Sequence, residues 1–239
     1  MHEPKFTSQP LHIQLREALI QRIASGAWRP GAAIPNEIDI AREYGLSAGT
    51  VRKALDWMEQ AHLVIRQQGR GTFVRDQSAD ELAQRYECLW DNAGRRIVPA
   101  CADTGVTTVE ADAYACDRLK LRPGHTVHCV TQLRILEGVP FMHEQVALPA
   151  DLFPSVSPGA YTVTGAASAN QVLLGHAEER VTLAEARGDV ALKLGVAEGL
   201  PLLKLDRVIF SIDRRPAEWR VAHCRLGNLH YRAAIGATV

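Results

Sequence analysis

Residues Asn36–Val74 read NEIDIAREYGLSAGTVRKALDWMEQAHLVIRQQGRGTFV. This stretch predicts two short helices joined by a tight turn, followed by a β-hairpin with a glycine-rich tip. In the second helix, the side chains expected to be buried are Val51, Ala54, Leu55 and Met58. The opposite face carries Gly49, Thr50, Arg52, Lys53 and Asp56. A helix-turn-helix whose second helix is apolar on one side, with small and basic residues on the other, fits the major groove of DNA.

Polar residues mark the ends of these helices. Asn36 is expected to cap the first helix, Gly45 to end it, and Ser47 to cap the second. An earlier helix is predicted to begin at Leu11 and to end at Gly26. The buried side of the first helix is assigned to Ile38, Ile40 and Ala41. Two capped helices with three residues between them are typical of a helix-turn-helix.

A β-hairpin is predicted directly after the second helix. Leu63–Arg66 and Thr72–Val74 supply its strands. Gly69 and Gly71 flank Arg70 at the tip, so the backbone can turn sharply and approach a phosphate or a minor groove closely. After a helix-turn-helix, such a hairpin is typical of the wing of a winged helix.

These segments together resemble the DNA-binding domain of the GntR family of bacterial transcription regulators. The matching segments are Leu11–Gly26, Gly31–Ile40, Gly45-Leu46-Ser47, Thr50–Leu55 and Gln68–Val74. The resemblance implies a winged-helix fold, binding to an operator in double-stranded DNA as a homodimer, and negative control of nearby genes.

Candidate DNA contacts lie at the helix caps, on the basic face of the second helix and at the wing tip. They are Asn36, Ser47, Gly49, Thr50, Arg52, Lys53, Gln68, Gly69 and Arg70. Ala48 and Ile38 depart from the family, which often has arginine at both positions. Because of this departure, we expect operator DNA to be recognised mainly by Thr50, Arg52, Lys53, Gln68 and Arg70. The alternative, a helical bundle with a merely solvated basic face, is disfavoured by the hairpin that follows.

The composition of the whole chain predicts a folded protein with two domains. Of 239 residues, 46% are hydrophobic and 23% are charged, which allows a buried core. The formal net charge is +0, but residues 1–75 carry +3 and the remainder −3, so positive charge lies where nucleic acid would bind. We predict a DNA-binding domain over 1–75, a linker over 76–94, and an effector-binding and dimerisation domain over 95–239.

Cysteines, histidines and hydropathy argue against disulfides, metal sites and membrane spans. The five cysteines form no CxxC pair, and no apolar run reaches the roughly 18 residues that span a bilayer. His125 and His128 lie on opposite faces of a predicted strand and cannot share a metal ion. We expect a soluble cytoplasmic protein with free thiols, no cofactor, no metal and no membrane partner.

The second half of the chain predicts an antiparallel sheet with helices between its strands. The predicted hairpins pair His125–Leu136 with Pro140–Leu148, and Leu202–Ile212 with Ala217–Leu226. Leu183–Gly195 is predicted to be a helix interrupted at Gly188. A part-helical stretch is expected through Leu82 and Trp90. The predicted fold class is therefore α+β.

Residues 108–235 are similar to the effector-binding (UTRA) domain of the HutC subfamily of GntR regulators, which shares its fold with chorismate lyase. The matching segments are Leu119–Leu121, Pro123-Gly124, Leu133-Arg134, Gly138–Pro140, Leu148–Pro154, Ala191–Leu203, Asp206-Arg207 and Pro216–Glu218. Val156–Val172 does not match. The resemblance implies a small-molecule effector that controls DNA binding.

Polar residues on the apolar face of the predicted strands are candidate effector contacts. Gln132 and Arg134 share one strand face, and Glu144 alternates with apolar residues, so its carboxylate must be paired, protonated or bound. Relatives that bind sugar phosphates have two arginines where this chain has Gln132 and Arg134. One guanidinium matches one carboxylate, so we expect a carboxylate-bearing effector. Further candidates are Arg180, Glu218, Arg225 and Tyr231.

The leading interpretation is a ligand-responsive repressor that binds a palindromic operator as a homodimer and has no enzymatic activity. One alternative is an enzyme of chorismate-lyase-like fold tethered to DNA, although no nucleophile–base set, phosphate loop or metal cluster is found in the sequence. Another is an effector-independent DNA-binding protein whose second domain serves only dimerisation.

Overall fold

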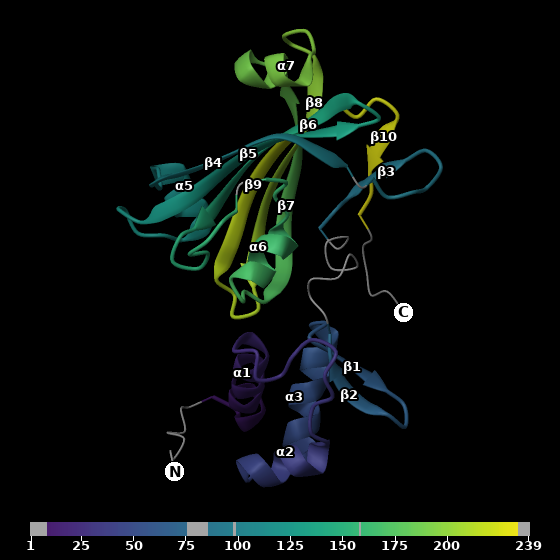
Figure 1. The fold of residues 1–239 in the computed structure, drawn as a ribbon, viewed down its shortest axis with the longest axis vertical. Helices are drawn as coiled ribbons and strands as arrows, with labels where there is room; N and C mark the ends of the chain where they lie inside the picture. The colour runs from purple at the N-terminus through teal and green to yellow at the C-terminus, as the bar shows by residue number, and fades with distance from the viewer. Residues whose placement is uncertain (1–8, 76–85, 98, 158, 234–239) are drawn as a thin grey trace. The chain divides into compact units, whose positions relative to one another are not determined.

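Two units make up the chain, Met1–Gln77 and Ser78–Val239, coloured from purple to yellow along the chain in Figure 1. The computed structural model describes residues 9–75, 86–97, 99–157 and 159–233. In these ranges, no helix combines the length and the apolar character that crossing a bilayer requires.

The first unit is a helix-turn-helix followed by a hairpin. Its elements are α1 (Leu11–Ala24), α2 (Glu37–Tyr44), α3 (Ala48–Gln60), β1 (Val64–Gln67) and β2 (Gly71–Val74). Its core is built mainly from the facing sides of α1 and α3. The buried side chains there are Leu15, Leu19, Ile23, Val51, Ala54, Leu55 and Met58. The apolar face predicted for the second helix is therefore confirmed.

The helix ends lie where the polar residues predict. The Asn36 side chain accepts a hydrogen bond from the Asp39 amide at 2.9 Å, and the Ser47 hydroxyl accepts one from the Thr50 amide at 3.2 Å. Gly45 ends α2 in the left-handed region with φ 63°. These contacts satisfy amides that the first turn of a helix leaves without partners.

Ile38 is a correction to the sequence analysis. Its side chain is 66% exposed, whereas Ile40 is fully buried. The face of α2 that turns toward the rest of the unit includes Glu37, whose carboxylate pairs with Arg52 on α3. Since successive helix residues are rotated by about 100°, this orientation turns Ile38 outward.

A third segment joins the wing. Ala33 forms a bridge with Phe73, the Gly31 amide donates to the Val74 carbonyl at 2.9 Å, and the Ile34 amide donates to the Thr72 carbonyl at 2.9 Å. The sequence analysis assigns no strand here, because a single bridge has no periodic pattern of its own.

The second unit is built on a six-stranded antiparallel sheet. The strand order is β4 (Ala100–Glu110), β5 (Thr126–Leu136), β6 (Val139–Pro149), β9 (Pro216–Cys224), β8 (Pro201–Ser211) and β7 (Leu174–Glu185). A separate pair joins β3 (Leu89–Asp91) to β10 (Leu229–Tyr231). Both predicted hairpins and the α+β fold class are confirmed.

Two predicted helical stretches are wrong in part. Leu183 pairs with Leu203 inside the β7–β8 ladder, so the predicted helix over Leu183–Gly195 is reduced to α7 (Gly188–Leu194). Ladder hydrogen bonds to a long neighbouring strand outweigh the local helical pattern. Leu89–Asp91 is strand rather than helix, and residues 76–85 of the predicted linker lie outside the described residues.

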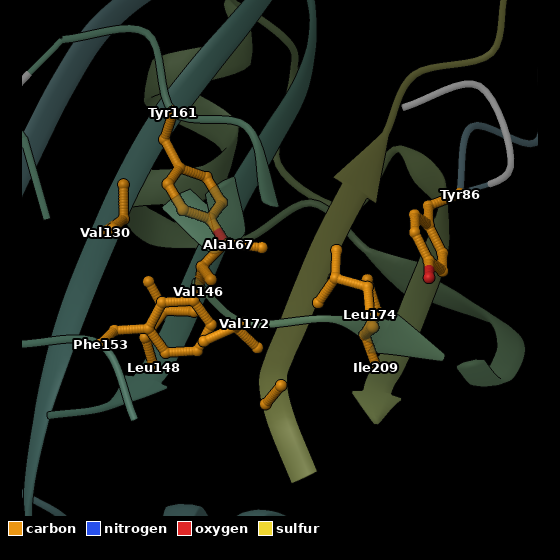
Figure 2. Close-up of a cluster of buried hydrophobic side chains, with 11 residues drawn as sticks. Tyr86, Val130, Val146, Leu148, Phe153, Tyr161, Ala167, Val172, Leu174 and Ile209 are labelled. Atoms are coloured by element: carbon orange, nitrogen blue, oxygen red, sulfur yellow. The ribbon is translucent and has the colours of Figure 1, made fainter. Parts of the chain in front are cut away.

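Helices cover both faces of this sheet. On one face, called the inner face here, α6 (Val163–Ala169) packs over strand residues such as Val130 and Ile209. Figure 2 shows the ring of Phe153 beside Leu148 and Val172 in this cluster. On the outer face lie α5 (Ala113–Leu119) and α7.

We expect Gly175→Ala to destabilise the second unit by about 1–3 kcal/mol, measured as a fall in Tm. A Cβ at this position would lie 3.1 Å from the Ser211 carbonyl oxygen and 3.2 Å from that of Phe210. Both obstacles are backbone atoms that cannot rotate away. The matched control is Gly105→Ala on β4, where a Cβ meets nothing within 4 Å. Equal Tm values for the two variants would contradict the prediction.

Candidate functional site

Glu37 ties together the three elements that present the candidate DNA-binding surface. Its carboxylate lies 3.0 Å from Arg52 Nη2 on α3 and 3.6 Å from Arg66 Nη2 on β1. Arg66 also pairs with Asp56 at 2.5 Å and Glu59 at 3.1 Å. The start of α2, the exposed side of α3 and the base of the wing are therefore held in one arrangement.

Lys53 and the wing tip are the uncommitted cationic groups of this surface. Lys53 is exposed and makes no salt bridge with any residue that the structure describes. Arg70 is exposed between Gly69 (φ 72°) and Gly71 (φ 110°), and its guanidinium lies 6.0 Å from the Phe73 ring centroid. Glycine accommodates both positive φ values without strain, so the tip can present backbone amides as well as Arg70.

The other predicted contacts are mostly committed to capping. Asn36 and Ser47 cap α2 and α3, and the Ser47 and Thr50 hydroxyls are 2.9 Å apart. Gly49 is exposed in the first turn of α3, and Gln68 is exposed at the wing. All nine predicted residues are exposed except Thr50, which is half-buried.

A cavity of about 40 Å³ opens on the inner face of the sheet in the second unit. It is lined by Tyr86, Glu87, Arg134, Tyr161, Thr162, Val163, Thr164, Arg207, Glu218 and Arg220. Three guanidinium groups from three strands converge on it. The cavity is too small in this form for a sugar-sized ligand, so a ligand of that size requires side chains to move.

Glu144 is the buried anion at the centre of this cluster. It has no exposed surface, and its two oxygens accept hydrogen bonds from Arg134 Nε at 2.6 Å and Arg220 Nη1 at 3.1 Å. Gln132 Nε2 also donates to it. Burial alone would raise the pKa of Glu144, but the two arginines lower this pKa below its usual value. The carboxylate therefore stays ionised.

The pKa of Glu218 is shifted in the opposite direction to that of Glu144. Burial raises the pKa of Glu218, and the nearby Arg220 opposes this effect only in part. The Tyr161 hydroxyl donates to its carboxyl group, and burial together with Glu218 raises the pKa of Tyr161 well above its usual value. The pKa values of two buried carboxyl groups, Glu218 on the cavity wall and Glu144 behind it, are thus shifted in opposite directions, as is common at functional sites.

Residues that precede β3 close one side of the cavity. Arg207 donates to the Tyr86 carbonyl and pairs with Glu179 at 2.6 Å. Glu87 Oε1 lies 4.0 Å from Arg134 Nη2, and its side chain is 24% exposed. The Glu87 carboxylate is therefore a weakly held partner of Arg134 at the cavity rim.

The structure brings four of the seven predicted effector residues together. Arg134 and Glu218 line the cavity, and Gln132 and Glu144 lie directly behind it. Three others lie elsewhere. Arg180 is exposed on β7, and Arg225 borders a separate apolar groove of about 300 Å³. Tyr231 donates to Glu179 at 2.8 Å.

The sequence analysis missed eight of the ten lining residues, including Glu87, Tyr161, Arg207 and Arg220. Arg220 alternates with Glu218 and Ala222 on one strand, and two charges in the buried phase of a strand were the available signal. Tyr161 lies in the stretch without a family match. The premise that a single guanidinium serves the site is wrong, because Arg220 shares Glu144 with Arg134.

Two family models match the chain at these two places. The model described as "Bacterial regulatory proteins, gntR family" covers residues 11–74, and the UTRA domain model covers residues 95–228. Together they span both the winged helix and the cavity-bearing sheet. The chain is a GntR-family transcription regulator with a UTRA domain.

Relatives of this regulator match along nearly its whole length. It is 29% identical to the HTH-type transcriptional regulator Rv0792c of Mycobacterium tuberculosis over 245 residues, covering 97% of this chain and 88% of that one. It is 28% identical to the HTH-type transcriptional repressor STM4068 of Salmonella typhimurium, covering 97% and 100%. The fold of its second unit is similar to the ligand-binding domain of a GntR-family regulator from Bordetella bronchiseptica, with TM-score 0.59, 23% identity, and coverage of 64% and 98%.

We expect Glu218→Gln to raise the Tm of the regulator near pH 8 and to change it little near pH 4. The unfolded carboxyl loses its proton near about pH 4.3, whereas burial raises the pKa of Glu218 in the folded state. Above the pKa of the unfolded state, the folded state therefore binds more protons at Glu218 than the unfolded state does. This difference makes the free energy of unfolding fall as the pH rises. Glutamine removes that loss and still accepts from Tyr161.

Thermal melts across this pH range measure the effect, and a gain of about 1 kcal/mol corresponds to roughly 2–4 °C. Glu110→Gln, which replaces a carboxylate by an amide at an exposed position of β4, is the matched control. An equal change at both pH values in Glu218→Gln would show that its charge state is not what burial imposes.

Proposed function

We propose that this regulator is a homodimeric repressor that binds a two-fold symmetric operator and responds to a small anionic metabolite. Residues 1–75 bind DNA, residues 95–239 bind the effector and dimerise, and the regulator acts in the cytoplasm, where the operator DNA lies. The observation that carries the proposal is the presence, in one chain, of a capped helix-turn-helix with a wing and a cavity lined by buried arginines. The relative STM4068 bears the name of a repressor.

The DNA contacts follow from exposure and charge. We assign α3 to the major groove through Gly49, Thr50, Arg52 and Lys53, and the wing tip to the backbone or minor groove through Gln68, Gly69 and Arg70. Asn36 and Ser47 support these contacts by capping their helices. Arg52 can reach a phosphate only by leaving Glu37, and an exposed ion pair of this kind costs about 0–1 kcal/mol to exchange.

The charge balance of the cavity favours a carboxylate over a phosphate. Arg134, Arg207 and Arg220 are matched by the ionised forms of Glu144, Glu179 and Glu87. Glu87 is the one of these carboxylates that lies at 4.0 Å and is partly exposed. A ligand with one negative charge can replace Glu87 beside Arg134 without changing the balance. A doubly charged phosphate would leave an excess negative charge in a buried site.

The proposed dimer interface lies in the second unit. Strand β7 is an edge of the sheet, and Leu183 on it is 79% exposed. Leu183 and Leu200 border the apolar groove of about 300 Å³ near Cys224. An open strand edge beside exposed leucines fits a self-complementary contact. A dimer places two α3 helices in successive major grooves about 34 Å apart.

An enzymatic role is disfavoured by the chemistry of the cavity. Glu218, whose pKa burial raises, is hydrogen-bonded to Tyr161, and none of the lining residues that the structure describes is a histidine, cysteine or serine. Incubation with a bound ligand should therefore return the ligand unchanged. If the second unit serves only dimerisation, no metabolite should alter the affinity of the protein for its operator.

We expect Lys53→Ala to weaken DNA binding at low salt and to flatten the dependence of log K on log salt. Each phosphate contact contributes a slope of about 0.9, so a dimer should lose about 1.8. The control is Arg42→Ala on α2, whose side chain is 78% exposed and pairs with Asp39. Fluorescence anisotropy over a salt series measures both. An unaltered slope in Lys53→Ala would remove this lysine from the phosphate contacts.

We expect a small monocarboxylate to change operator affinity by about 5–150-fold, the usual range of coupling between two sites. The test uses an operator selected from randomised duplexes and compares panels of small carboxylates and sugar phosphates by anisotropy. Arg134→Lys should abolish the response, because lysine lacks the planar guanidinium with which Arg134 binds Glu144 and would bind the ligand in place of Glu87. The control Arg225→Lys lies outside the cavity and should keep it. A response confined to sugar phosphates would overturn the carboxylate assignment.

A further inference from the structure

Glu87 is held much more weakly than the buried carboxylate at the centre of the cluster. Its Oε1 atom lies 4.0 Å from Arg134 Nη2, beyond hydrogen-bond distance, and its side chain is 24% exposed. Glu144, by contrast, is fully buried and accepts hydrogen bonds from Arg134 and Arg220. A carboxylate at the cavity rim that faces a guanidinium at this distance can leave it at low cost.

The charge of Glu87 nevertheless acts on two guanidinium groups. Burial lowers the pKa of Arg134 and of Arg220, but Glu144 and then Glu87 raise both pKa values above the usual one. Without a negative charge at the position of Glu87, a buried cation of this cluster would lack its counter-charge. This position therefore favours an anion, whether the anion belongs to the chain or to a ligand.

The space beside Glu87 suits a free carboxylate. The cavity of about 40 Å³ has room for about three water molecules, which is enough for a formate ion. Outward movement of Glu87 would add the volume that its own carboxylate fills. A ligand can therefore place a carboxylate next to Arg134 without any change in the strands of the sheet.

The chain segment that carries Glu87 uses the same cations. Tyr86 and Glu87 are the first residues after the first unit that the structure describes, and both line the cavity. Arg207 donates to the Tyr86 carbonyl, and its Nη2 atom lies 3.8 Å from Cys88 Sγ. An anion that binds Arg134 and Arg207 therefore competes with the contacts that hold this segment on the sheet.

We propose that Glu87 is a built-in substitute for the effector. Its carboxylate occupies the anion position beside Arg134 in the ligand-free regulator, and the carboxylate of the effector displaces it. The inference rests on the proposed effector-binding function and deepens it by naming the contact that the ligand breaks. Because residues 76–85 connect this segment to the DNA-binding unit, its release gives the effector a route by which to alter operator binding.

The first test replaces the missing carboxylate with a free one. Glu87→Ala should lower the Tm of the full chain by about 2–4 °C in chloride, because Arg134 loses a counter-charge. Formate at the same ionic strength should restore most of this loss, since it can enter the space that the side chain leaves. Equal ionic strength keeps the screening of all other charges the same.

Asp151→Ala is the matched control. Asp151 pairs with Arg215 at 2.7 Å, both side chains are about half exposed, and neither lines the cavity. Water replaces the lost carboxylate there, so formate and chloride should give the same Tm. If formate stabilises Glu87→Ala no more than Asp151→Ala, no anion takes the position of Glu87 and the inference is overturned.

The second test measures affinity for an operator selected by the full-length chain. Without any metabolite, Glu87→Ala should differ from the unmodified regulator by about fivefold or more, because Arg134 no longer holds the segment. Formate should restore the Tm of this variant but not its operator affinity, since formate is not joined to the chain. Asp151→Ala should bind the operator as the unmodified regulator does. An unchanged operator affinity in Glu87→Ala would also overturn the inference.

The inference and the proposed function fail separately. The formate measurement requires neither DNA nor the natural effector. If a carboxylate controls operator binding but formate does not rescue Glu87→Ala, the proposed function stands and the role of Glu87 is wrong. If formate rescues the variant but no metabolite alters operator affinity, the anion position is supported and the proposed regulation fails.

Discussion

The buried carboxylate of Glu144 constrains the whole interior of the second unit. An ionised group without solvent contact is stable only when its charge and its lone pairs are matched. Arg134 from β5 and Arg220 from β9 supply that match from the strands on either side of β6. Removing one partner of such a cluster typically costs 3–5 kcal/mol. The apolar inner face therefore contains a polar centre, and the cavity lies beside it.

The first unit uses charge differently because its ion pairs are near water. Glu37 connects α2, α3 and β1, yet Arg52 is largely exposed. Exposed pairs contribute little net stability and are screened by salt, so a phosphate can take the place of Glu37 at small cost. The buried cluster of the second unit is suited to hold one arrangement, whereas the exposed cluster of the first unit is suited to exchange partners on DNA.

Local sequence patterns predicted the first unit closely because caps, turns and apolar faces are short-range features. Asn36, Gly45 and Ser47 lie at the helix ends where their chemistry predicts. Ile38 is the exception, because a hydrophobic residue by itself does not reveal which way a short helix turns. In the second unit the strand pattern predicted Glu144 as a buried carboxylate. It did not predict that Arg220 contacts Glu144 or that Tyr161 contacts Glu218, because these contacts join residues 76 and 57 positions apart.

The sequence by itself determined the winged helix, the two hairpins and the presence of a charged group inside the sheet. Each of these depends on residues close together in the chain, whose periodicity and capping chemistry are visible without a fold. Only the tertiary structure decided which charges meet around Glu144, that Glu218 faces Tyr161, and that Ile38 is exposed beside the recognition helix. Strand order and helix orientation set those distances, and both result from packing that involves the entire unit.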